Sequence, residues 1–384
     1  MTVDLLTATS ANAIDERPNV SASWQYHNPV AVHFGWGSLE QLPALLGGRR
    51  AVLVTFPEAG ASGLRSRIEA MLGKRLATVI DDVQPNPELD WVSNTYRAFW
   101  RQHPDCVVLA VGGGSVLDSA KMLLPGVASG DFAEIHAALA AGKAPAVTHT
   151  LPMIAVPTTA GTGSEVTPWA TLWDRTSGKP KKYSLHLNET WPEAALVDPE
   201  LTLSLPATVT RNSGLDALSH ALESIWNVNC NPVSDALAVE AARTVIATLP
   251  ALLKNPQDKA LRSAAARASL QAGLAFSNTK TALAHSISYD MTLLHGLPHG
   301  LACSFTLPMV WRLAQGKRLD RDAVLARIFG REVADPAAVL ETFLRELGVD
   351  TRFSAYGVTE DKARSMIDAA MQGPRGRNFV GAAA

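Results

Sequence analysis

Four polar residues in the second half of the chain have side chains of the kind that bind metals in proteins. Asp216 and His220 stand four positions apart in a segment with helical spacing, so both side chains project from one helix face, about one turn apart. His285 lies in a nearly uncharged helical stretch, where a lone histidine needs a buried partner, and His299 stands in a loop-like LPHG segment. An Asp/His pair alone is usually a surface hydrogen bond, but the two additional histidines favour a metal site.

One carboxylate and three neutral imidazoles suit a divalent first-row cation. Such a set leaves a net charge of about +1, which would polarise an alcohol or carbonyl oxygen at an open coordination position. Ligand chemistry does not choose between Fe(II) and Zn(II). The alternative is that the four side chains serve unrelated structural roles.

A glycine-rich loop in the first half of the chain has the residues needed to bind phosphate. The strand-like run 106–111 leads straight into this loop, and a helix is expected to begin near Val116. Glycines allow close backbone approach, and the free N–H groups at a helix start carry partial positive charge, so a pyrophosphate would bind there. A glycine triplet without the GxGxxG spacing is more often only a tight turn. The loop consists of Gly112, Gly113, Gly114 and Ser115.

Two charged residues follow this loop, and a second loop has similar properties. Asp118 would complement the helix dipole, whereas Lys121 is either functional or a solvated surface charge. The second loop, 158–165, is either a hydroxyl-rich turn or a set of donors for ribose and phosphate oxygens. Both loops follow strands of one expected parallel sheet, and ligands bind outside the carboxyl ends of such strands, so we interpret them together as a dinucleotide site. The donors in the second loop are Thr158, Thr159 and Thr162.

The elements that position these residues fall into two domains. Over residues 1–205, short apolar runs alternate with helical patterns, and this βαβ order predicts an α/β dinucleotide-binding domain with a parallel sheet. Over residues 206–384, Ala/Leu-rich helical spacing predicts an all-α metal-binding domain. The tail from Gly373 to Phe379 is expected to be loosely ordered. Helices are expected near 211–227, 232–253, 257–277, 279–291, 299–315, 320–329, 336–347 and 359–371.

Composition argues against several classes of partner. The 34 basic and 36 acidic residues give a net charge of −2, and no basic tract is present, so nucleic acid is not an expected partner. The three cysteines are widely spaced without a CxxC pair, which predicts neither a disulfide framework nor a thiolate zinc site and fits the cytoplasm. The N-terminus lacks the uninterrupted apolar core of a signal peptide, and charge, glycine or proline interrupts every candidate membrane span, so no membrane partner is expected.

Several motifs occur together in the order and spacing of one known family. The chain contains GGGSVLDSAK, PTTAGTGSEV, DPEL, GLDALSHALE and AHSISY followed by LPHG, and over about residues 28–315 it resembles the iron-containing alcohol dehydrogenases. The resemblance implies an N-terminal dinucleotide-binding domain and a C-terminal helical domain, with metal and nicotinamide facing each other across the cleft. It also implies that the four residues described first bind Fe(II) or Zn(II), and that the two loops, with Asp118, bind NADH or NADPH.

The chain departs from the pattern of this family at two positions. Many members have a histidine, often treated as a proton shuttle, four residues after the third metal ligand, where this chain has Tyr289. We therefore hypothesise that proton transfer uses His295, Tyr289 or a relayed water. NAD-preferring relatives commonly carry an aspartate where Phe56 stands, and without that repulsive charge both NADH and NADPH remain open as cofactors.

The helical-domain motifs are most similar to the branch of the family associated with phosphonate metabolism. That resemblance implies hydride transfer to a small aldehyde, phosphonoacetaldehyde, to give the alcohol 2-hydroxyethylphosphonate. Maleylacetate reductase and a dehydroquinate synthase-like lyase, which shares the architecture, are the alternatives, and a homodimer is compatible with the sequence. A phosphonate dianion would need nearby cations. The candidates, which flank the cofactor and metal segments, are Lys181, Lys182, Arg211 and Lys280.

Overall fold

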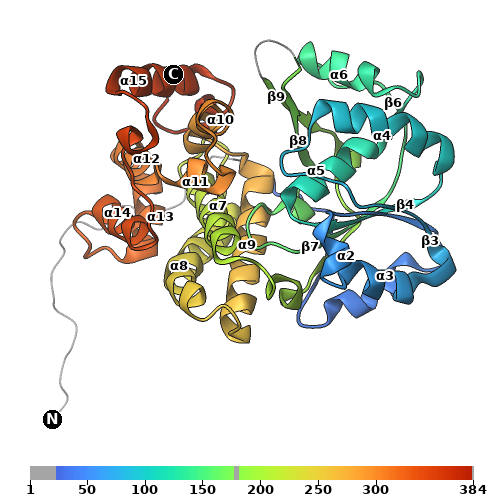
Figure 1. The fold of residues 1–384 in the computed structure, drawn as a ribbon. Coiled ribbons are helices and arrows are strands. Elements are labelled where there is room, and N and C mark those ends of the chain that lie inside the picture. The colour runs from blue at the N-terminus through green and yellow to red at the C-terminus, as the bar shows by residue number, and fades with distance from the viewer. Residues whose placement is uncertain (1–22, 177–180, 383–384) are drawn as a thin grey trace.

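The structure, a computed structural model, describes residues 23–176 and 181–382. The N-terminal segment, for which the sequence predicts no signal peptide, lies outside these residues. A six-stranded sheet forms the centre of the first half, and all neighbouring strands in it run parallel. The predicted α/β domain with a parallel sheet is therefore confirmed (Figure 1). The order across the sheet is β1 (Ala31–Phe34), β10 (Ala194–Val197), β7 (Met153–Pro157), β4 (Val107–Gly112), β2 (Ala51–Val54) and β3 (Leu76–Ile80).

Helices cover both faces of this sheet. Val52 and Val108 belong to the apolar cluster on one face, whereas their neighbours Leu53 and Leu109 belong to the cluster on the other face. Successive strand residues point to opposite faces, so a strand covered on both sides is apolar at every position. The first face is covered by α4 (Leu89–Gln102), α5 (Gly114–Leu123) and α6 (Phe132–Ala140), and the second by α1 (Leu42–Leu46) and α3 (Leu64–Leu72), with α2 (Glu58–Ala61) beside α3.

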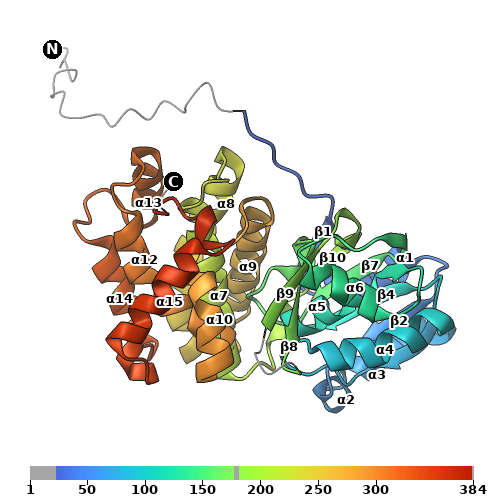
Figure 2. The same cartoon turned by 90° about the horizontal axis from the view of Figure 1, so that it is seen from above.

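Two antiparallel strand pairs and several 3-10 turns complete the first half. One pairs β5 (Pro125–Val127) with β6 (Val147–Thr150), on either side of α6 in the chain, and the other is the hairpin of β8 (Trp169–Asp174) and β9 (Lys181–His186). Figure 1 and Figure 2 both place the β8–β9 hairpin on the side of the α/β domain that faces α10. The 3-10 turns are η1 (Ser38–Gln41), η2 (Gly73–Arg75), η3 (Ser164–Val166), η4 (Asn188–Thr190) and η5 (Pro199–Thr202).

The second half of the described chain is helical, as predicted, and one large apolar cluster joins its helices (Figure 2). The predicted helix 299–315 is in fact two helices. Pro308 stands in the first turn of the second one, because its ring would clash with the carbonyl of residue 304 in a continuous helix. The elements are α7 (Ala207–Ile225), α8 (Pro232–Lys254), α9 (Lys259–Thr279), α10 (Leu283–His295), α11 (His299–Ser304), α12 (Leu307–Ala314), α13 (Leu319–Phe329), α14 (Pro336–Glu346), η6 (Phe353–Tyr356), α15 (Glu360–Gln372) and η7 (Gly376–Asn378).

Among the helices of the described chain, α8 has the length and apolar composition that a membrane span would need. It packs against α7 and α9 and buries Ala238, Ala242 and Val245 in the helical-domain cluster. Its Asp235 forms a buried ion pair with Arg321 of α13 at 2.8 Å. The apolar character of α8 is therefore that of a core helix.

The C-terminal segment is fixed against the helical domain, so the prediction of a loosely ordered tail is wrong. Phe379 is 1% exposed and belongs to the apolar cluster of this domain. The Val380 N–H donates to the Trp226 carbonyl at 3.2 Å, and the Asn378 amide donates to the Thr281 carbonyl at 2.8 Å. Burial of one aromatic ring and these bonds to distant segments hold the tail, and local sequence spacing carries no sign of either.

Candidate metal and cofactor site

Three helices bring the predicted metal ligands together. Asp216 and His220 stand one turn apart on α7, and both side chains are buried. His285 lies in the first turn of α10, and His299 is the first residue of α11. The helical spacing that the sequence predicts for the first pair is therefore present, and tertiary packing adds the other two residues.

The close approach of α11 to α7 depends on Gly300. A Cβ atom at this position would lie 1.9 Å from the carbonyl oxygen of Asn212, so any larger residue would force the two helices apart. Since His299 immediately precedes Gly300, this contact also sets how near the His299 ring comes to Asp216.

The four side chains gather around the Oδ1 atom of Asp216. The Nε2 atom of His285 lies 3.5 Å from this oxygen, and the Nε2 atoms of His220 and His299 each lie 3.9 Å from it. The rings of His220 and His285 stack with their centroids 4.5 Å apart. All four predicted ligands therefore surround one point.

These side chains fit a bound cation, because two of their polar atoms are buried without a partner. Asp216 Oδ1 and His285 Nε2 have no hydrogen-bond partner among the described residues. Burying a polar group without a partner is unfavourable, and a coordinated divalent cation would satisfy such atoms. The donor set of one oxygen and three imidazole nitrogens suits Fe(II) and Zn(II).

For three of the four side chains the protonation state also suits metal binding, whereas the neighbouring Cys303, Glu223 and Asp216 raise the pKa of His285 above its ordinary value. Burial lowers the pKa of His220 to about 4, and burial with the nearby Lys182 ammonium lowers the pKa of His299 to about 3, so both rings are neutral at pH 7. Burial alone would raise the pKa of Asp216, but the surrounding histidines outweigh it and lower the pKa, so Asp216 is a carboxylate. A carboxylate and neutral imidazoles are the forms that coordinate metals.

Glu223 is a site residue that the sequence analysis misses. It is fully buried on α7, and its Oε2 atom lies 2.6 Å from His285 Nδ1. Its carboxylate also accepts hydrogen bonds from the backbone N–H groups of Ala282 and His285. A carboxylate on one ring nitrogen orients a histidine so that its other nitrogen faces the metal. The spacing in the sequence could have indicated this residue, since Glu223 follows His220 by three residues on the same helix.

Cys303 is a second residue that the sequence analysis does not place here. Its Sγ atom lies 3.6 Å from both ring nitrogens of His299, one turn earlier on α11. Metal-competent atoms of Cys303, Asp216, His285 and His299 all lie within 4.8 Å of one another. Burial raises the pKa of the Cys303 thiol, so it stays protonated at neutral pH. The spacing of the three cysteines gave no reason to expect a thiol beside the metal site.

The two predicted cofactor loops lie side by side at the carboxyl ends of β4 and β7. These strands are direct neighbours, with Gly112 opposite Pro157, and the Thr158 N–H donates to the Gly112 carbonyl at 2.9 Å. A Cβ atom on Gly114 would lie 2.5 Å from Thr162 Cγ2, and one on Gly113 would lie 3.2 Å from Thr159 Cγ2. The N-terminus of α5 has no side-chain cap, so its first N–H groups are available to an anion.

Asp118 and Lys121 hold the two loops together. The Asp118 carboxylate accepts hydrogen bonds from Ser164 Oγ at 2.7 Å and from the Thr171 N–H at 2.9 Å. Lys121 is fully buried, and its ammonium donates to the carbonyl oxygens of Ser164 and Trp169 at 2.6 and 2.9 Å. The alternative of a solvated surface charge at Lys121 is therefore wrong, and the physical reason is this set of internal acceptors.

The second loop also contacts the helical domain. A Cβ atom on Gly161 would lie 2.7 Å from the Ser213 backbone of α7, and one on Gly163 would lie 2.5 Å from the Gly273 Cα of α9. Gly163 has a φ of 59°, a left-handed conformation that favours glycine. The cofactor loop is thus packed against the same helix that carries Asp216.

The two candidates for proton transfer lie in different places on α10. Tyr289 is one turn beyond His285, and its buried hydroxyl has no hydrogen-bond partner among the described residues. His295 lies at the end of the helix, where its Nε2 atom is 3.2 Å from the Lys362 ammonium. Ten residues of helix separate His295 from His285, about 15 Å along the axis, so the structure does not bring His295 to the metal group.

Of the four predicted substrate cations, Lys182 reaches the neighbourhood of the metal group, with its ammonium 4.0 Å from the Tyr289 ring centroid. Lys181, the residue before it on β9, is exposed. Arg211 donates to the Leu347 carbonyl at 3.3 Å, and Lys280 lies 5.9 Å from the Trp169 ring. Phe56, in the loop after β2, packs against the apolar cluster on one face of the sheet.

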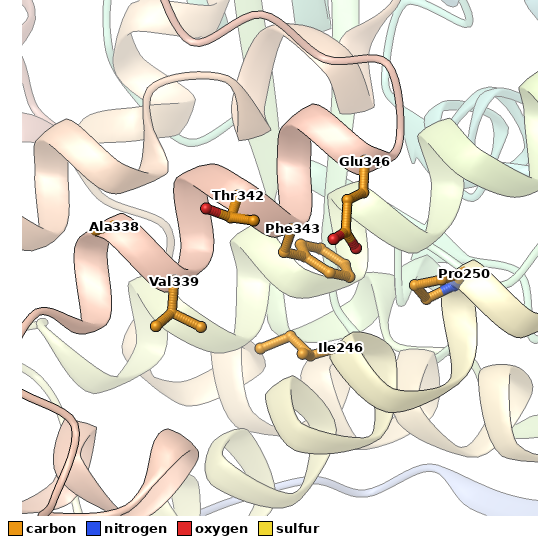
Figure 3. A pocket seen from close by; sticks show the side chains of 7 residues that line it. All are labelled: Ile246, Pro250, Ala338, Val339, Thr342, Phe343 and Glu346. Atoms are coloured by element: carbon orange, nitrogen blue, oxygen red, sulfur yellow. The ribbon is translucent and has the colours of Figure 1, made fainter.

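Two pockets lie outside the metal group. One, of about 350 Å³, borders the phosphate loop, because its lining residue Asn86 donates its backbone N–H to Ser115 Oγ at 3.1 Å. The other, of about 480 Å³, lies between α8 and α14 (Figure 3). No predicted site residue lines it, so we do not include it in the site. Its lining residues are Ile246, Pro250, Ala338, Val339, Thr342, Phe343 and Glu346.

Comparison with known protein families gives two adjoining matches. A family described as iron-containing alcohol dehydrogenase matches residues 29–199. A second family, described as the C-terminal part of the Fe-containing alcohol dehydrogenase family, matches residues 210–380. Together the two matches cover both halves of the described chain.

Individual relatives agree with these matches. The chain is 32% identical to long-chain-alcohol dehydrogenase 1 of Geobacillus thermodenitrificans over 90% of each chain, and 31% identical to the NAD-dependent methanol dehydrogenase of Bacillus methanolicus over 87% of this chain and 89% of that one. Among solved structures, it is similar to the sulfoacetaldehyde reductase of Bifidobacterium kashiwanohense in complex with NAD+. That likeness has a TM-score of 0.84 and 31% identity and covers 93% of this chain and 94% of that one.

Proposed function

The chain belongs to the iron-containing alcohol dehydrogenase family and is an oxidoreductase of that class, and on this premise we propose that it reduces phosphonoacetaldehyde to 2-hydroxyethylphosphonate with NADH or NADPH. The observation that carries the proposal is the buried group of unpartnered ligand atoms around Asp216, packed beside the two cofactor loops. Similarity to a sulfoacetaldehyde reductase supports the substrate class, because sulfoacetaldehyde is also a two-carbon aldehyde with a tetrahedral oxyanion.

We assign the metal to Asp216, His220, His285 and His299, with Fe(II) or Zn(II) as the cation. When bound, the cation supplies Lewis acidity toward a carbonyl oxygen and the reduced nicotinamide supplies the hydride. Glu223 holds the His285 ring so that Nε2 faces the other ligands. The packing of three helices around these residues limits the entry of water, since the exposed fractions of their side chains are 4–6%, except for 30% at His299.

The remaining roles concern the cofactor and the proton. We assign the pyrophosphate to the loop Gly112–Ser115, where the start of α5 offers free N–H groups. The residues Thr158, Thr159 and Thr162 supply hydroxyl groups beside that loop. We assign the proton delivered to the product oxygen to the Tyr289 hydroxyl, or to a water that it holds, because this hydroxyl lies one turn beyond His285.

A substrate and metal panel tests this function. The purified chain is loaded with Fe(II) or Zn(II) without oxygen, and oxidation of NADH and of NADPH is followed with phosphonoacetaldehyde, maleylacetate and propanal. We expect the highest kcat/KM with phosphonoacetaldehyde. A preference for maleylacetate would assign the chain to the maleylacetate reductases instead, and no net consumption of NAD(P)H with any of the three would favour the lyase.

A pair of matched variants tests the metal assignment. Asp216→Asn should lose both bound metal and activity, because an amide oxygen is a weaker ligand than a carboxylate. Asp368→Asn, on the exposed face of α15, serves as the control and should retain both. Equal metal content in the two variants after dialysis would refute the assignment of Asp216.

A further inference from the structure

Two cations face one aromatic ring beside the metal group. The Lys182 ammonium lies 4.0 Å from the Tyr289 ring centroid, and the Arg375 guanidinium carbon lies 4.9 Å from the same centroid. Both distances are measured to the same ring centroid, so the separation of the two charges cannot exceed the sum of the two distances. Among the described residues, no carboxylate lies within 4.0 Å of either cation, and neither has a hydrogen-bond partner.

Three separate segments bring these residues together. Tyr289 follows His285 by one turn on α10, Lys182 comes from β9 of the α/β domain, and Arg375 comes from the C-terminal segment just before η7. The Trp173 ring also lies 5.0 Å from the Lys182 ammonium. Aromatic faces attract cations, so the two rings hold Lys182 in place without neutralising its charge.

The cations lie at the more open side of the metal group. The His299 side chain is 30% exposed, whereas the other three predicted ligands are 4–6% exposed, so a substrate would reach the metal past His299. Tyr289, whose ring centroid lies 4.0 Å from the Lys182 ammonium, is one turn beyond the predicted ligand His285 on α10. A molecule bound to the metal on this side would therefore extend toward Lys182.

Two half-buried cations without counter-charges repel each other, and an anion bound between them would remove that repulsion. Burial and the Arg375 charge lower the pKa of Lys182 to about 7, and burial lowers the pKa of Arg375 to about 10. Three acids act on them from a distance, and each already has another role. Asp118 is bonded to Ser164 and Thr171, Glu223 is bonded to His285, and Asp216 is the carboxylate of the metal group.

We propose that Lys182 and Arg375 form the subsite that binds the tetrahedral oxyanion of the aldehyde substrate, a phosphonate or sulfonate. The inference rests on the proposed function and names the residues that select its substrate. A single methylene separates the oxyanion from the carbonyl carbon in these aldehydes, so an anion between the two cations keeps the carbonyl near the metal group. A guanidinium donates two parallel hydrogen bonds and an ammonium adds a point charge, which suits an anion with three oxygens.

Variants at the two cations test the subsite, with Lys181→Met as the matched control because Lys181 adjoins Lys182 on β9 but is exposed. We expect Lys182→Met and Arg375→Met each to lower kcat/KM for phosphonoacetaldehyde and sulfoacetaldehyde by about 30- to 100-fold. The same variants should lower kcat/KM for propanal at least tenfold less than for the two anionic aldehydes, and Lys181→Met should resemble the wild type. Arg375→Lys should recover part of the loss, since it restores the charge without the paired hydrogen bonds.

Three outcomes would overturn the proposal. Equal losses with propanal would indicate a structural role for the two residues. A raised KM for NAD(P)H with an unchanged KM for the aldehydes would assign the cations to the cofactor phosphates. A wild-type enzyme that reduces propanal as well as the anionic aldehydes would refute the subsite while leaving aldehyde reduction intact.

Absence of turnover with every aldehyde would refute the proposed function. In that case a binding measurement still tests the subsite. Calorimetric titration of the metal-loaded wild type with methylphosphonate should show binding. Arg375→Met should weaken that binding at least tenfold and Lys181→Met should not. Equal affinity of the three proteins, or no binding to the wild type, would refute the subsite itself.

Discussion

Removing the charge of Glu223 should weaken metal binding without removing a ligand. In the structure, Glu223 Oε2 accepts from His285 Nδ1 at 2.6 Å and from the Ala282 N–H at 2.9 Å, while Oε1 accepts from the His285 N–H at 3.2 Å. In Glu223→Gln, the amide oxygen can replace only one of these atoms, and the amide N–H₂ group then faces a donor. The variant therefore loses at least one hydrogen bond and the charge that strengthens the bond to His285.

Two magnitudes follow from this geometry. Loss of a carboxylate that orients a ligating histidine lowers metal affinity by about 10- to 100-fold, or about 1.4 to 2.7 kcal/mol. A buried donor left without an acceptor lowers the free energy of unfolding by about 1 to 3 kcal/mol. Because Glu223 is fully buried, solvent cannot replace the lost partner.

The assay is competition for Zn(II) between the protein and a chelator, combined with calorimetric unfolding of the metal-free protein. Glu360→Gln is the control, because the Glu360 side chain is 90% exposed and its ion pair with Arg364 is long, at 3.8 Å. A Glu223→Gln variant whose Zn(II) affinity stays within twofold of the wild type would refute the orienting role of Glu223.

Three further perturbations have outcomes that the structure predicts. Burial raises the pKa of Glu165 to about 7 from 4.5, so the folded chain keeps a proton that the unfolded chain releases between these values, and folding stability falls as pH rises through that window. Relative to that of the wild type, the free energy of unfolding of Glu165→Gln should therefore rise by up to about 3 kcal/mol between pH 4.5 and pH 8. If the melting temperatures of the two proteins differ by the same amount at both pH values, this prediction is contradicted. Phe379→Ala removes a ring that is 1% exposed and should lower the free energy of unfolding by about 3 to 5 kcal/mol in denaturant titrations, whereas a loosely held tail would leave it unchanged. Gly114→Ala would place a Cβ 2.5 Å from Thr162 Cγ2 and should weaken NADH binding, measured by fluorescence titration, at least tenfold. An unchanged affinity for NADH would show that this loop does not bind the cofactor.

Local spacing was enough to predict much of the geometry of the candidate site. Asp216 and His220 share a helix face because four residues make about one turn, whatever the helix packs against. The two cofactor loops could be placed at one edge because apolar strands followed by helices form parallel sheets, and the carboxyl ends of neighbouring strands then meet. The resemblance to a family added His285 and His299, whose separation along the chain has no local geometric meaning.

Residues that depend on contacts between distant segments could not be found in this way. Lys121 follows the phosphate loop as a surface charge would, and only the folded second loop supplies the acceptors that bury it. Cys303 has no partner in sequence, and it reaches the metal group because Gly300 allows α11 to approach α7.

The two cations beside Tyr289 show the same limit most clearly. The sequence alone determined that the chain has a helical Asp/His pair, two small-residue loops at strand ends, and several lysines and arginines near them. Only the tertiary structure selected Lys182 from those candidates and added Arg375 from a tail that was expected to be loose. The physical reason is that burial and charge pairing are properties of packed elements, and the order of residues within one element does not contain them.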